Sequence, residues 1–351
     1  MCSKHVLASV LSLIFSLSAL AGTQEQESKK CPYTAPIPFT SALNVNSKYD
    51  PNDPSRSTEI DVDANSLKIQ QHINRFSSGI SYFGDYYLTK PNTSNALIAS
   101  ACLNEWLTAW ASSNALTSTD STSTGKAIRV WALSSIASTL LKTQTAETLP
   151  TTTVQWLDQI ANQIINDYDE RRYITPNRTN NHDYWAAWAV AATGLINQQR
   201  TMTDWGYSML LHATNQAYFD PISGTYYLPN ELARGHLAAF YTHFALAPLS
   251  MLSAYLPEAG YTLDYHALQT LSGLGSNAYL LTEAPDSLAH LGITTQSQVS
   301  PYVFAWTHPF NTQADLQNDA TTSLESQYQS SFTNYPQLGG NVQLLPLPAS
   351  R

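Results

Sequence analysis

The segment TNNHDYWAAWAV, residues 179–190, combines two amides and an imidazole with a row of aromatic rings. A helix that begins here needs one asparagine as its cap, and either Asn180 or Asn181 can serve. His182 would then lie in the first turn, on the same face as Trp185. Free backbone amides and the positive end of the helix dipole favour a nearby anion and a neutral imidazole. The pattern indicates an anion-binding site, and the alternative is a capped helix with a surface His and buried Trp residues.

A second candidate is YLPNELARGHLAAFYTHFALAPL, residues 227–249, in which Arg234 and Tyr241 are seven positions apart. On a continuous helix this spacing is two turns, so both side chains would project from nearly the same face, about 10 Å apart along the axis. An arginine and a tyrosine in an otherwise apolar segment indicate a buried polar site. The alternative is a tyrosine at an interface, beside an arginine whose aliphatic part packs on the core while its charge reaches water.

A third candidate is the segment SKYDPNDPSRS, residues 47–57, which has two prolines, two aspartates and an asparagine and is therefore predicted to be a loop. Lys48, Tyr49 and Arg56 add two cations and an aromatic ring to it. The loop is either simply solvated or a lid that closes over an anionic chain.

The elements that must position these residues are predicted to be helices. Apolar residues recur at helical spacing in a series of segments that short polar connectors separate. These segments are 62–87, 93–116, 124–145, 152–170, 181–198, 201–218, 231–254 and 263–280. Short links make consecutive helices antiparallel neighbours, so we expect an all-α fold, a helical toroid or bundle. Residues 224–231 can form a short turn or strand, and no change in composition divides residues 22–351 into two domains.

The composition and the missing motifs exclude several functions. The formal charge is −9, which argues against nucleic acid as a partner because phosphate binding needs a basic surface. No nucleotide-binding glycine motif stands on a strand-to-helix turn, and no HExxH, CxxC or GxSxG motif occurs. We therefore expect no metal ion and no cofactor. A hydrolase with two catalytic carboxylates stays open, because such partners need not be close in sequence.

Residues 1–21 have the pattern of a secretory signal: basic residues, an apolar run, and an Ala-Leu-Ala cleavage pattern. No later segment looks long and apolar enough to span a membrane. We therefore expect a periplasmic or secreted protein. In an oxidising compartment the two cysteines that remain, Cys31 and Cys102, most simply form a disulfide. The alternative is a pair of buried free thiols.

Together these segments resemble the alginate lyases of polysaccharide lyase family 5. The specific elements are NNHDYWAAW, residues 180–188, and PNELARGHLAAFY, residues 229–241. The supporting elements are SKYDPNDPSRS, CLNEWLTAWASSNAL, TGKAIRVWAL and QLGGNV, in this order along nearly the whole mature chain. The resemblance implies an incomplete α/α toroid with a deep cleft. It also implies an enzyme that cleaves mannuronate-rich alginate, an anionic polysaccharide, by β-elimination.

The resemblance implies roles for individual residues. Asn181, His182, Arg234 and Tyr241 match the catalytic positions of the family. The expected substrate-binding residues are Lys48, Tyr49, Arg56, Ser123, Thr124, Arg129, Trp131, Tyr184 and Trp185, although packing in the core is the expected role of most of the aromatic rings. The family often has His-Thr-Gly-Lys where this chain has Ser-Thr-Gly-Lys at 123–126, so one substrate contact of the family is missing.

The chemistry of β-elimination explains these residue types. The reaction removes the proton at C5, beside a carboxylate, and expels the glycosidic oxygen at C4. Arg234 and Asn181 can neutralise the carboxylate as charge builds up on it. In mannuronate the C5 hydrogen and O4 lie on the same side of the ring, so Tyr241 can act as acid and also as base. The pKa of a tyrosine is about 10, so Arg234 and His182 would have to lower it, and His182 is the alternative base.

Two other functions remain open at this point. One is a polysaccharide-binding or export-associated protein without catalysis, and the other is a glycoside hydrolase on a helical toroid. In each case we expect a monomer.

Overall fold

The computed structural model describes residues 30–145, 148–293 and 295–347, so the predicted signal segment lies outside the described residues. The helices are α1 Ala64–Thr89, α2 Ser94–Ser112, α3 Ser123–Thr143, α4 Thr151–Ile174, α5 Asn181–Asn197, α6 Arg200–Gln216, α7 Pro229–Leu232, α8 Ala238–Tyr255, α9 Tyr265–Glu283, α10 Thr307–Asn311 and α11 Asp319–Tyr328. A hairpin of β1 Tyr218–Asp220 and β2 Thr225–Tyr227 joins α6 to α7. The predicted all-α fold is confirmed, and β2 confirms the short strand within 224–231.

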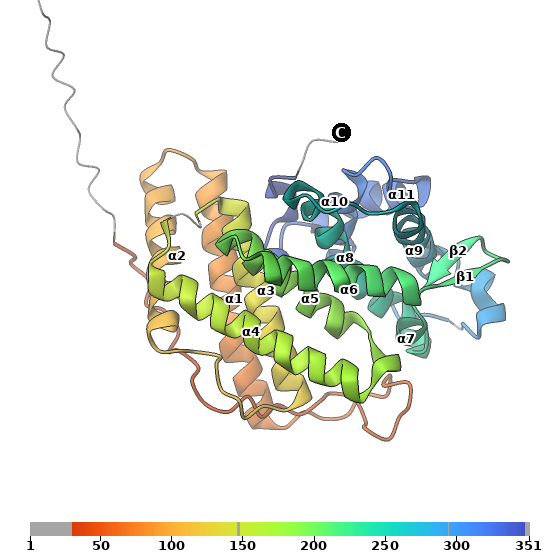
Figure 1. Cartoon of the computed structure of the whole chain (residues 1–351), viewed down its shortest axis with the longest axis horizontal. Coiled ribbons are helices and arrows are strands. Elements are labelled where there is room, and N and C mark those ends of the chain that lie inside the picture. Colours follow the sequence, from red (N-terminus) through yellow and green to blue (C-terminus); the bar gives the residue numbers. More distant parts are fainter. Residues whose placement is uncertain (1–29, 146–147, 294, 348–351) are drawn as a thin grey trace, which may run out of the picture.

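Consecutive helices pack as pairs and form two layers (Figure 1). The pairs are α1–α2, α3–α4, α5–α6 and α8–α9. Their first members, α1, α3, α5 and α8, contact one another in this order and form an inner row. On the outside α2 contacts α4, and α6 contacts α9. This is the double-layered arrangement of an α/α toroid, and it leaves the row open between its two ends, α1 and α8.

The inner helices are buried on nearly all sides, which explains their weak amphipathicity in the sequence. On α5, every residue from Asp183 to Gly194 is buried. A helix that is apolar all round belongs inside the protein. Small residues let its neighbour approach: a Cβ on Gly206 of α6 would lie 2.6 Å from the Cβ of Ala191. Glycine at that position therefore sets the distance between α5 and α6.

The predicted helix 231–254 is wrong as a single element. A 3-10 turn, η3 Gly235–Leu237, separates α7 from α8. Pro229 occupies the start of α7, and Gly235 has a φ of 59°, a left-handed conformation that interrupts a helix. Arg234 therefore lies in the connection and Tyr241 in the first turn of α8. The two-turn spacing on one helix does not describe their relation.

The region that begins at this turn is unusually apolar. Among the described residues, Gly235–Ala259 is long and apolar enough to cross a membrane by length and composition, with a mean hydropathy of 1.3. The expectation that no segment of the mature chain meets these limits is therefore wrong. Within the protein, 83% of this apolar window is buried, as in an inner helix of a globular core.

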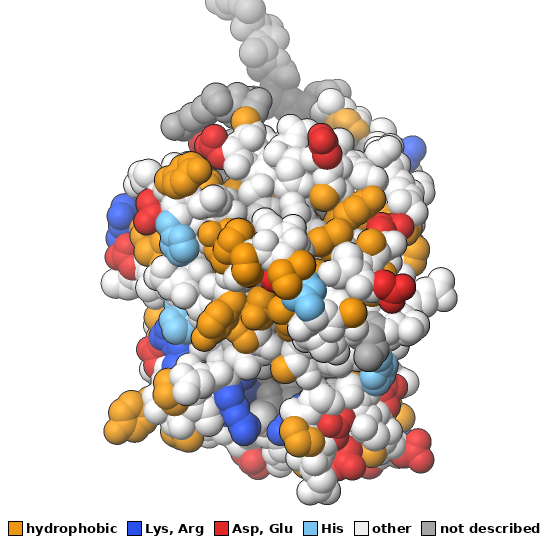
Figure 2. Space-filling model, turned by 90° about the vertical axis from the view of Figure 1, so that its right-hand side faces the viewer, with side chains coloured by type: hydrophobic (Ala, Val, Ile, Leu, Met, Phe, Trp, Pro, Cys, Tyr) orange, Lys and Arg blue, Asp and Glu red, His pale blue; other side chains and the backbone are white. Residues whose placement is uncertain are grey.

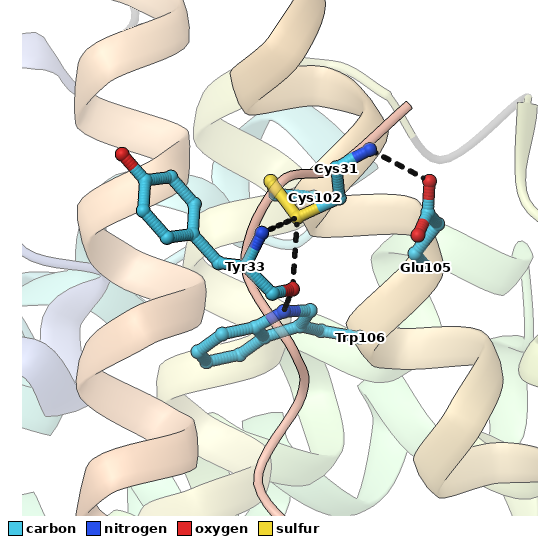
Figure 3. Close-up of a disulfide and its surroundings, with 5 residues drawn as sticks. All are labelled: Cys31, Tyr33, Cys102, Glu105 and Trp106. Carbon is cyan, nitrogen blue, oxygen red and sulfur yellow. Dashed lines mark hydrogen bonds between the residues drawn. A yellow bond between two sulfur atoms is a disulfide. The ribbon is translucent and has the colours of Figure 1, made fainter. Parts of the chain in front are cut away.

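The predicted disulfide is present between Cys31 and Cys102, whose Cα atoms are 4.6 Å apart (Figure 3). It attaches the extended N-terminal segment to α2. Two further contacts hold the same segment: Trp106 Nε1 donates to the carbonyl of Tyr33 at 3.1 Å, and Glu105 accepts from the amide of Cys31 at 2.9 Å. This anchored segment leads directly to residues 47–57.

We expect the double replacement Cys31→Ala and Cys102→Ala to lower the free energy of unfolding by about 4 kcal/mol, because the bond closes a loop of 71 residues in the unfolded chain. Urea denaturation with and without a reducing agent measures the loss. The reducing agent should shift the midpoint of the wild type and leave the variant unchanged. Equal midpoints for wild type and variant would contradict a stabilising role.

Candidate active site

The start of α5 is fixed by a capping box, in which Asn180 is the N-cap. Its side chain accepts from the amide of His182 at 3.1 Å, and its own amide donates to the carboxylate of Asp183 at 2.9 Å. Asp183 is buried and paired with Arg171 of α4, which neutralises it. Asn180 therefore serves as the cap, and the next two residues are left for other contacts.

Asn181 is fully buried and bound to Glu231 of α7. Its amide donates to Oε1 of Glu231 at 2.5 Å, and its Nδ2 donates to Oε2 at 3.0 Å. Burial raises the pKa of Glu231 to about 7, against the opposing effect of these hydrogen bonds and of Arg234. The contact joins two segments that lie 50 positions apart in the sequence.

His182 lies half-buried beside the ring of Trp131, with 5.9 Å between the ring centroids. Burial, and then the positive charges of nearby arginines, Arg234 and Arg56 among them, lower its pKa to about 3. The imidazole is therefore neutral at physiological pH. It can accept or donate a hydrogen bond, and it carries no charge that could lower the pKa of Tyr241.

Arg234 and Tyr241 are brought together although no single helix carries them. The guanidinium carbon of Arg234 lies 3.6 Å from the centroid of the Tyr241 ring and 4.8 Å from that of Tyr49. The hydroxyl of Tyr241 donates to the hydroxyl of Tyr49 at 2.6 Å. Nε of Arg234 is buried and has no hydrogen-bond partner. An unpaired buried donor on a cation is costly, so this group is suited to bind an anion.

The expected depression of the Tyr241 pKa is wrong for this state of the protein. Burial raises the pKa well above its usual value, and the bond to Tyr49 adds to this. The charge of Arg234 acts in the opposite direction and is outweighed. Tyr241 therefore carries its proton here, which is the form that an acid needs.

The loop at 47–57 is an ordered hairpin-like segment that covers these groups. Backbone bonds join Asp50 to Thr58 at 3.0 Å and Ile60 to Lys48 at 2.8 Å. The carboxylate of Asp53 accepts from the hydroxyl of Ser55 and from several backbone amides across the turn, and these bonds, that from the Ser55 hydroxyl first, hold its pKa well below the usual range. These bonds make the loop a compact unit.

The loop contacts the catalytic candidates directly. A guanidinium nitrogen of Arg234 donates to the carbonyl of Arg56. Tyr49 supplies the hydroxyl that pairs with Tyr241, and Lys48 lies 4.9 Å from the Tyr49 ring while it pairs with Glu59. Figure 2 shows basic side chains beside a hollow in the lower part of one face. These contacts tie the loop to Arg234 and Tyr241.

Three of the residues predicted to bind substrate are placed elsewhere, because their side chains are fully buried. Arg129 is paired with Asp167 and with the carbonyl of Leu116, both at 2.8 Å. Tyr184 is bonded to Gln216 of α6, and Trp185 packs inside the core. In this structure Arg129, Tyr184 and Trp185 thus have structural contacts within the protein, and the binding roles predicted for them stay predictions.

The remaining predicted residues lie at or near the surface. Ser123 is exposed and Thr124 half-buried at the start of α3, where a bridge between Leu43 and Ser121 brings in the chain that leads to the lid. Trp131, two turns further along α3, is half-buried and faces His182. Of the rings of Trp131, Tyr184 and Trp185, that of Trp131 is the one available to a ligand beside the catalytic candidates.

Glu231 is the functional candidate that the sequence analysis missed. The signal was present, because it is an acidic residue in an otherwise apolar segment, three positions before Arg234. Periodicity cannot show that its carboxylate meets Asn181. Among the residues that the structure describes, no group of three or more His, Cys, Asp or Glu side chains could hold a metal ion.

Comparison with known proteins identifies the family of this chain. A family model described as alginate lyase matches residues 44–285. An alginate lyase of Pseudomonas fluorescens is 30% identical over 328 residues, which are 90% of this chain and 84% of the relative. Alginate lyases of Cobetia marina and Azotobacter vinelandii are 29% and 28% identical, over 79% and 93% of this chain and 74% and 86% of those relatives.

Solved structures show the same fold. A complex of alginate lyase A1-III with a tetrasaccharide superposes with a TM-score of 0.69 at 17% identity, over 91% of this chain and 87% of that one. The A1-III structure from Sphingomonas species A1 gives 0.67 at 17% identity, over 89% and 85% of the two chains. At this identity the likeness speaks for the α/α toroid alone, whereas the family model and the relatives extend to the sequence. The chain therefore belongs to the alginate lyase family.

Proposed function

We propose that this protein is an alginate lyase that cleaves β-1,4 linkages of mannuronate-rich chains by β-elimination. The observation that carries the proposal is the cluster of Arg234, Tyr241, His182 and Asn181 under a lid. It supplies a cation for a carboxylate, a protonated phenol and a neutral imidazole in one place. Membership of the alginate lyase family supports the lyase activity, and these side chains support β-elimination as its mechanism.

In the proposed reaction the sugar carboxylate binds Arg234 through the unpaired Nε and the nitrogen that now contacts the lid. A planar guanidinium matches a carboxylate and stays charged. Neutralisation favours loss of the C5 proton, because the negative charge that grows on the carboxylate in the transition state is stabilised. The lid must open first, since Arg56 and Tyr49 occupy these groups in the closed state.

Tyr241 is assigned as the acid and also as the base. After substrate binds, the phenol first loses its proton to solvent. The phenolate then takes the C5 proton as the C4–O4 bond breaks and the C4–C5 double bond forms, and the phenol returns this proton to O4 from the same side of the ring. Release of Tyr49 removes one of the contacts that raise the pKa of Tyr241. His182 is neutral and can donate a hydrogen bond to the sugar carboxylate, or serve as the alternative base that accepts the C5 proton.

We also propose that the protein works as a monomer after export to the periplasm or outside the cell. The disulfide between Cys31 and Cys102 supports export, because such bonds persist in oxidising compartments. The signal pattern in residues 1–21 is consistent with it. N-terminal sequencing of protein recovered from the periplasm tests the prediction, which requires a chain that begins at about residue 22.

Poly-mannuronate mixed with the protein should gain ultraviolet absorbance, because the new double bond is conjugated with the carboxylate. Guluronate blocks, in which the C5 hydrogen and O4 lie on opposite faces, should give a much slower rise. A folded protein that gives no rise on mannuronate would contradict the proposal. Saturated products would instead identify a hydrolase, and binding without cleavage would identify a non-catalytic polysaccharide-binding protein.

A further inference from the structure

The contact between Asn181 and Glu231 poses a problem for carboxylate binding. Both residues are fully buried. Nδ2 of Asn181 lies 3.2 Å from Oε1 and 3.0 Å from Oε2 of Glu231, and the backbone amide lies 2.5 Å from Oε1. All the donors of Asn181 therefore point at one carboxylate, and none is left for a second one.

The oxygen of the Asn181 side-chain amide differs from the donors of this residue, which all have a partner. Oδ1 of Asn181 is buried and has no hydrogen-bond partner. It presents an acceptor, which repels the carboxylate of a sugar. A buried acceptor without a partner costs free energy, so this orientation of the amide is held by the charge of Glu231 alone.

We propose that Glu231 is a positioning residue that takes up one proton when substrate binds and thereby turns the amide of Asn181 toward the sugar carboxylate. The proton comes from solvent and forms an O–H bond on Glu231. This hydroxyl donates to Oδ1 of Asn181 after a half-turn about its Cβ–Cγ bond, and Nδ2 then donates to the substrate. The backbone amide of Asn181 keeps its bond to the other oxygen of Glu231. The inference rests on the proposed function, because it concerns the anion of that substrate.

The surroundings of Glu231 favour such a proton. Asp183 and Tyr184 face it from α5, Arg234 from the connection before η3, and Tyr241 from α8. Burial and, to a smaller extent, the charge of Asp183 raise the pKa of Glu231, the hydrogen bonds from Asn181 and then the charge of Arg234 lower it, and the result is about 7. A sugar carboxylate nearby adds a second negative charge and neutralises Arg234, and both effects raise the pKa further.

The expected pH dependence of substrate binding follows from the raised pKa of Glu231. Below about pH 7, Glu231 of the free protein already holds the proton, so binding takes up none and the dissociation constant is flat. Above this pH each binding event takes up one proton, and the dissociation constant rises about tenfold per pH unit until the pKa of the complex is reached. His182 does not titrate in this range in the free protein, since its pKa is about 3.

The variant Glu231→Gln tests the proposal because its side chain is neutral and has the same shape. Its amide can donate to Oδ1 of Asn181 and accept from the backbone amide, so it fixes the binding orientation permanently. Its dissociation constant for mannuronate oligosaccharides should be independent of pH between 6 and 9, and its affinity at pH 9 should exceed that of the parent about tenfold or more. Circular dichroism and thermal melting verify that the variant is folded.

The measurement is isothermal titration calorimetry at pH 8.5 in two buffers that differ in ionisation enthalpy. Tyr241→Phe serves as the background so that the oligosaccharide is not cleaved. We expect an uptake of about one proton in this background and none once Glu231→Gln is added. Glu325→Gln is the matched control, since Glu325 also accepts from an asparagine, Asn311, at 2.7 Å, and it should leave the uptake unchanged.

Three results separate the possible failures. Proton uptake that persists in Glu231→Gln, with wild type active on mannuronate, overturns the role of Glu231 and assigns the proton to another group such as His182. If wild type neither binds nor cleaves mannuronate, the proposed function fails and this inference fails with it. A variant that folds but loses affinity at every pH also overturns the proposal, because it shows that the charged form is the one required.

Discussion

Replacement of Tyr241 by Phe is expected to lower kcat on poly-mannuronate by about 10³-fold or more, because one hydroxyl is assigned both proton transfers and each is typically worth 10²–10⁴-fold. The change removes one oxygen from a ring that is 7% exposed and packs against Arg234. The fold and the binding of substrate should therefore remain. Initial rates of ultraviolet absorbance, with binding measured separately by calorimetry, distinguish lost chemistry from lost affinity.

Tyr49→Phe provides the matched control for this experiment. It breaks the same hydroxyl–hydroxyl bond of 2.6 Å from the other side and leaves the hydroxyl of Tyr241 in place. We expect it to change kcat far less than Tyr241→Phe does. Equal losses from both variants would show that the pair of hydroxyls, rather than Tyr241 as the acid and base, is what catalysis requires.

Replacement of Arg234 is expected to give the second large effect. Arg234→Ala should reduce kcat/KM by at least about 10²–10³-fold, the usual loss when one preorganised donor to a developing charge is removed. Arg234→Lys keeps the charge but loses the planar fork and the contact with two tyrosine rings, so it should recover only part of the rate. The same absorbance assay, with KM and kcat determined separately, measures both variants.

The loss should fall mainly on kcat, since the charge on the carboxylate grows in the transition state. Arg178→Ala is a suitable control, because Arg178 is exposed at the end of a 3-10 turn before α5. It tests whether any nearby positive charge attracts the polyanion. If Arg234→Ala raised KM and left kcat unchanged, Arg234 would bind substrate without stabilising the transition state.

The position of most helices could be predicted from the sequence. The periodicity of apolar residues placed α1 to α6 and α9 to within a few residues at most ends, because helical spacing is a local property of the chain. Asn180 or Asn181 was predicted to cap the helix that begins near residue 181, and Asn180 indeed caps α5. The same rules failed at 231–254, where Gly235 adopts a left-handed conformation that periodicity does not register.

The residues of the site could be named, but their arrangement could not be derived. Arg234 and Tyr241 were predicted to meet through two turns of one helix. They meet instead because α7 and η3 fold the chain back over the start of α8. The predicted lowering of the Tyr241 pKa failed for a related reason, since the degree of burial depends on the lid and on packing. The spacing of residues in the sequence gives neither the contact between Arg234 and Tyr241 nor the degree of burial of Tyr241.

The sequence by itself determined the residue types, the helical character of the chain and the pairing of Cys31 with Cys102. The tertiary structure decided which of these residues can act. It buried Arg129, Tyr184 and Trp185 in the core. It brought the hydroxyl of Tyr49 to that of Tyr241 across 192 positions, and the carboxylate of Glu231 to Asn181 across 50. Such contacts arise from the packing of helices that are distant in sequence, and their hydrogen bonds and desolvation set the charges on which the chemistry depends.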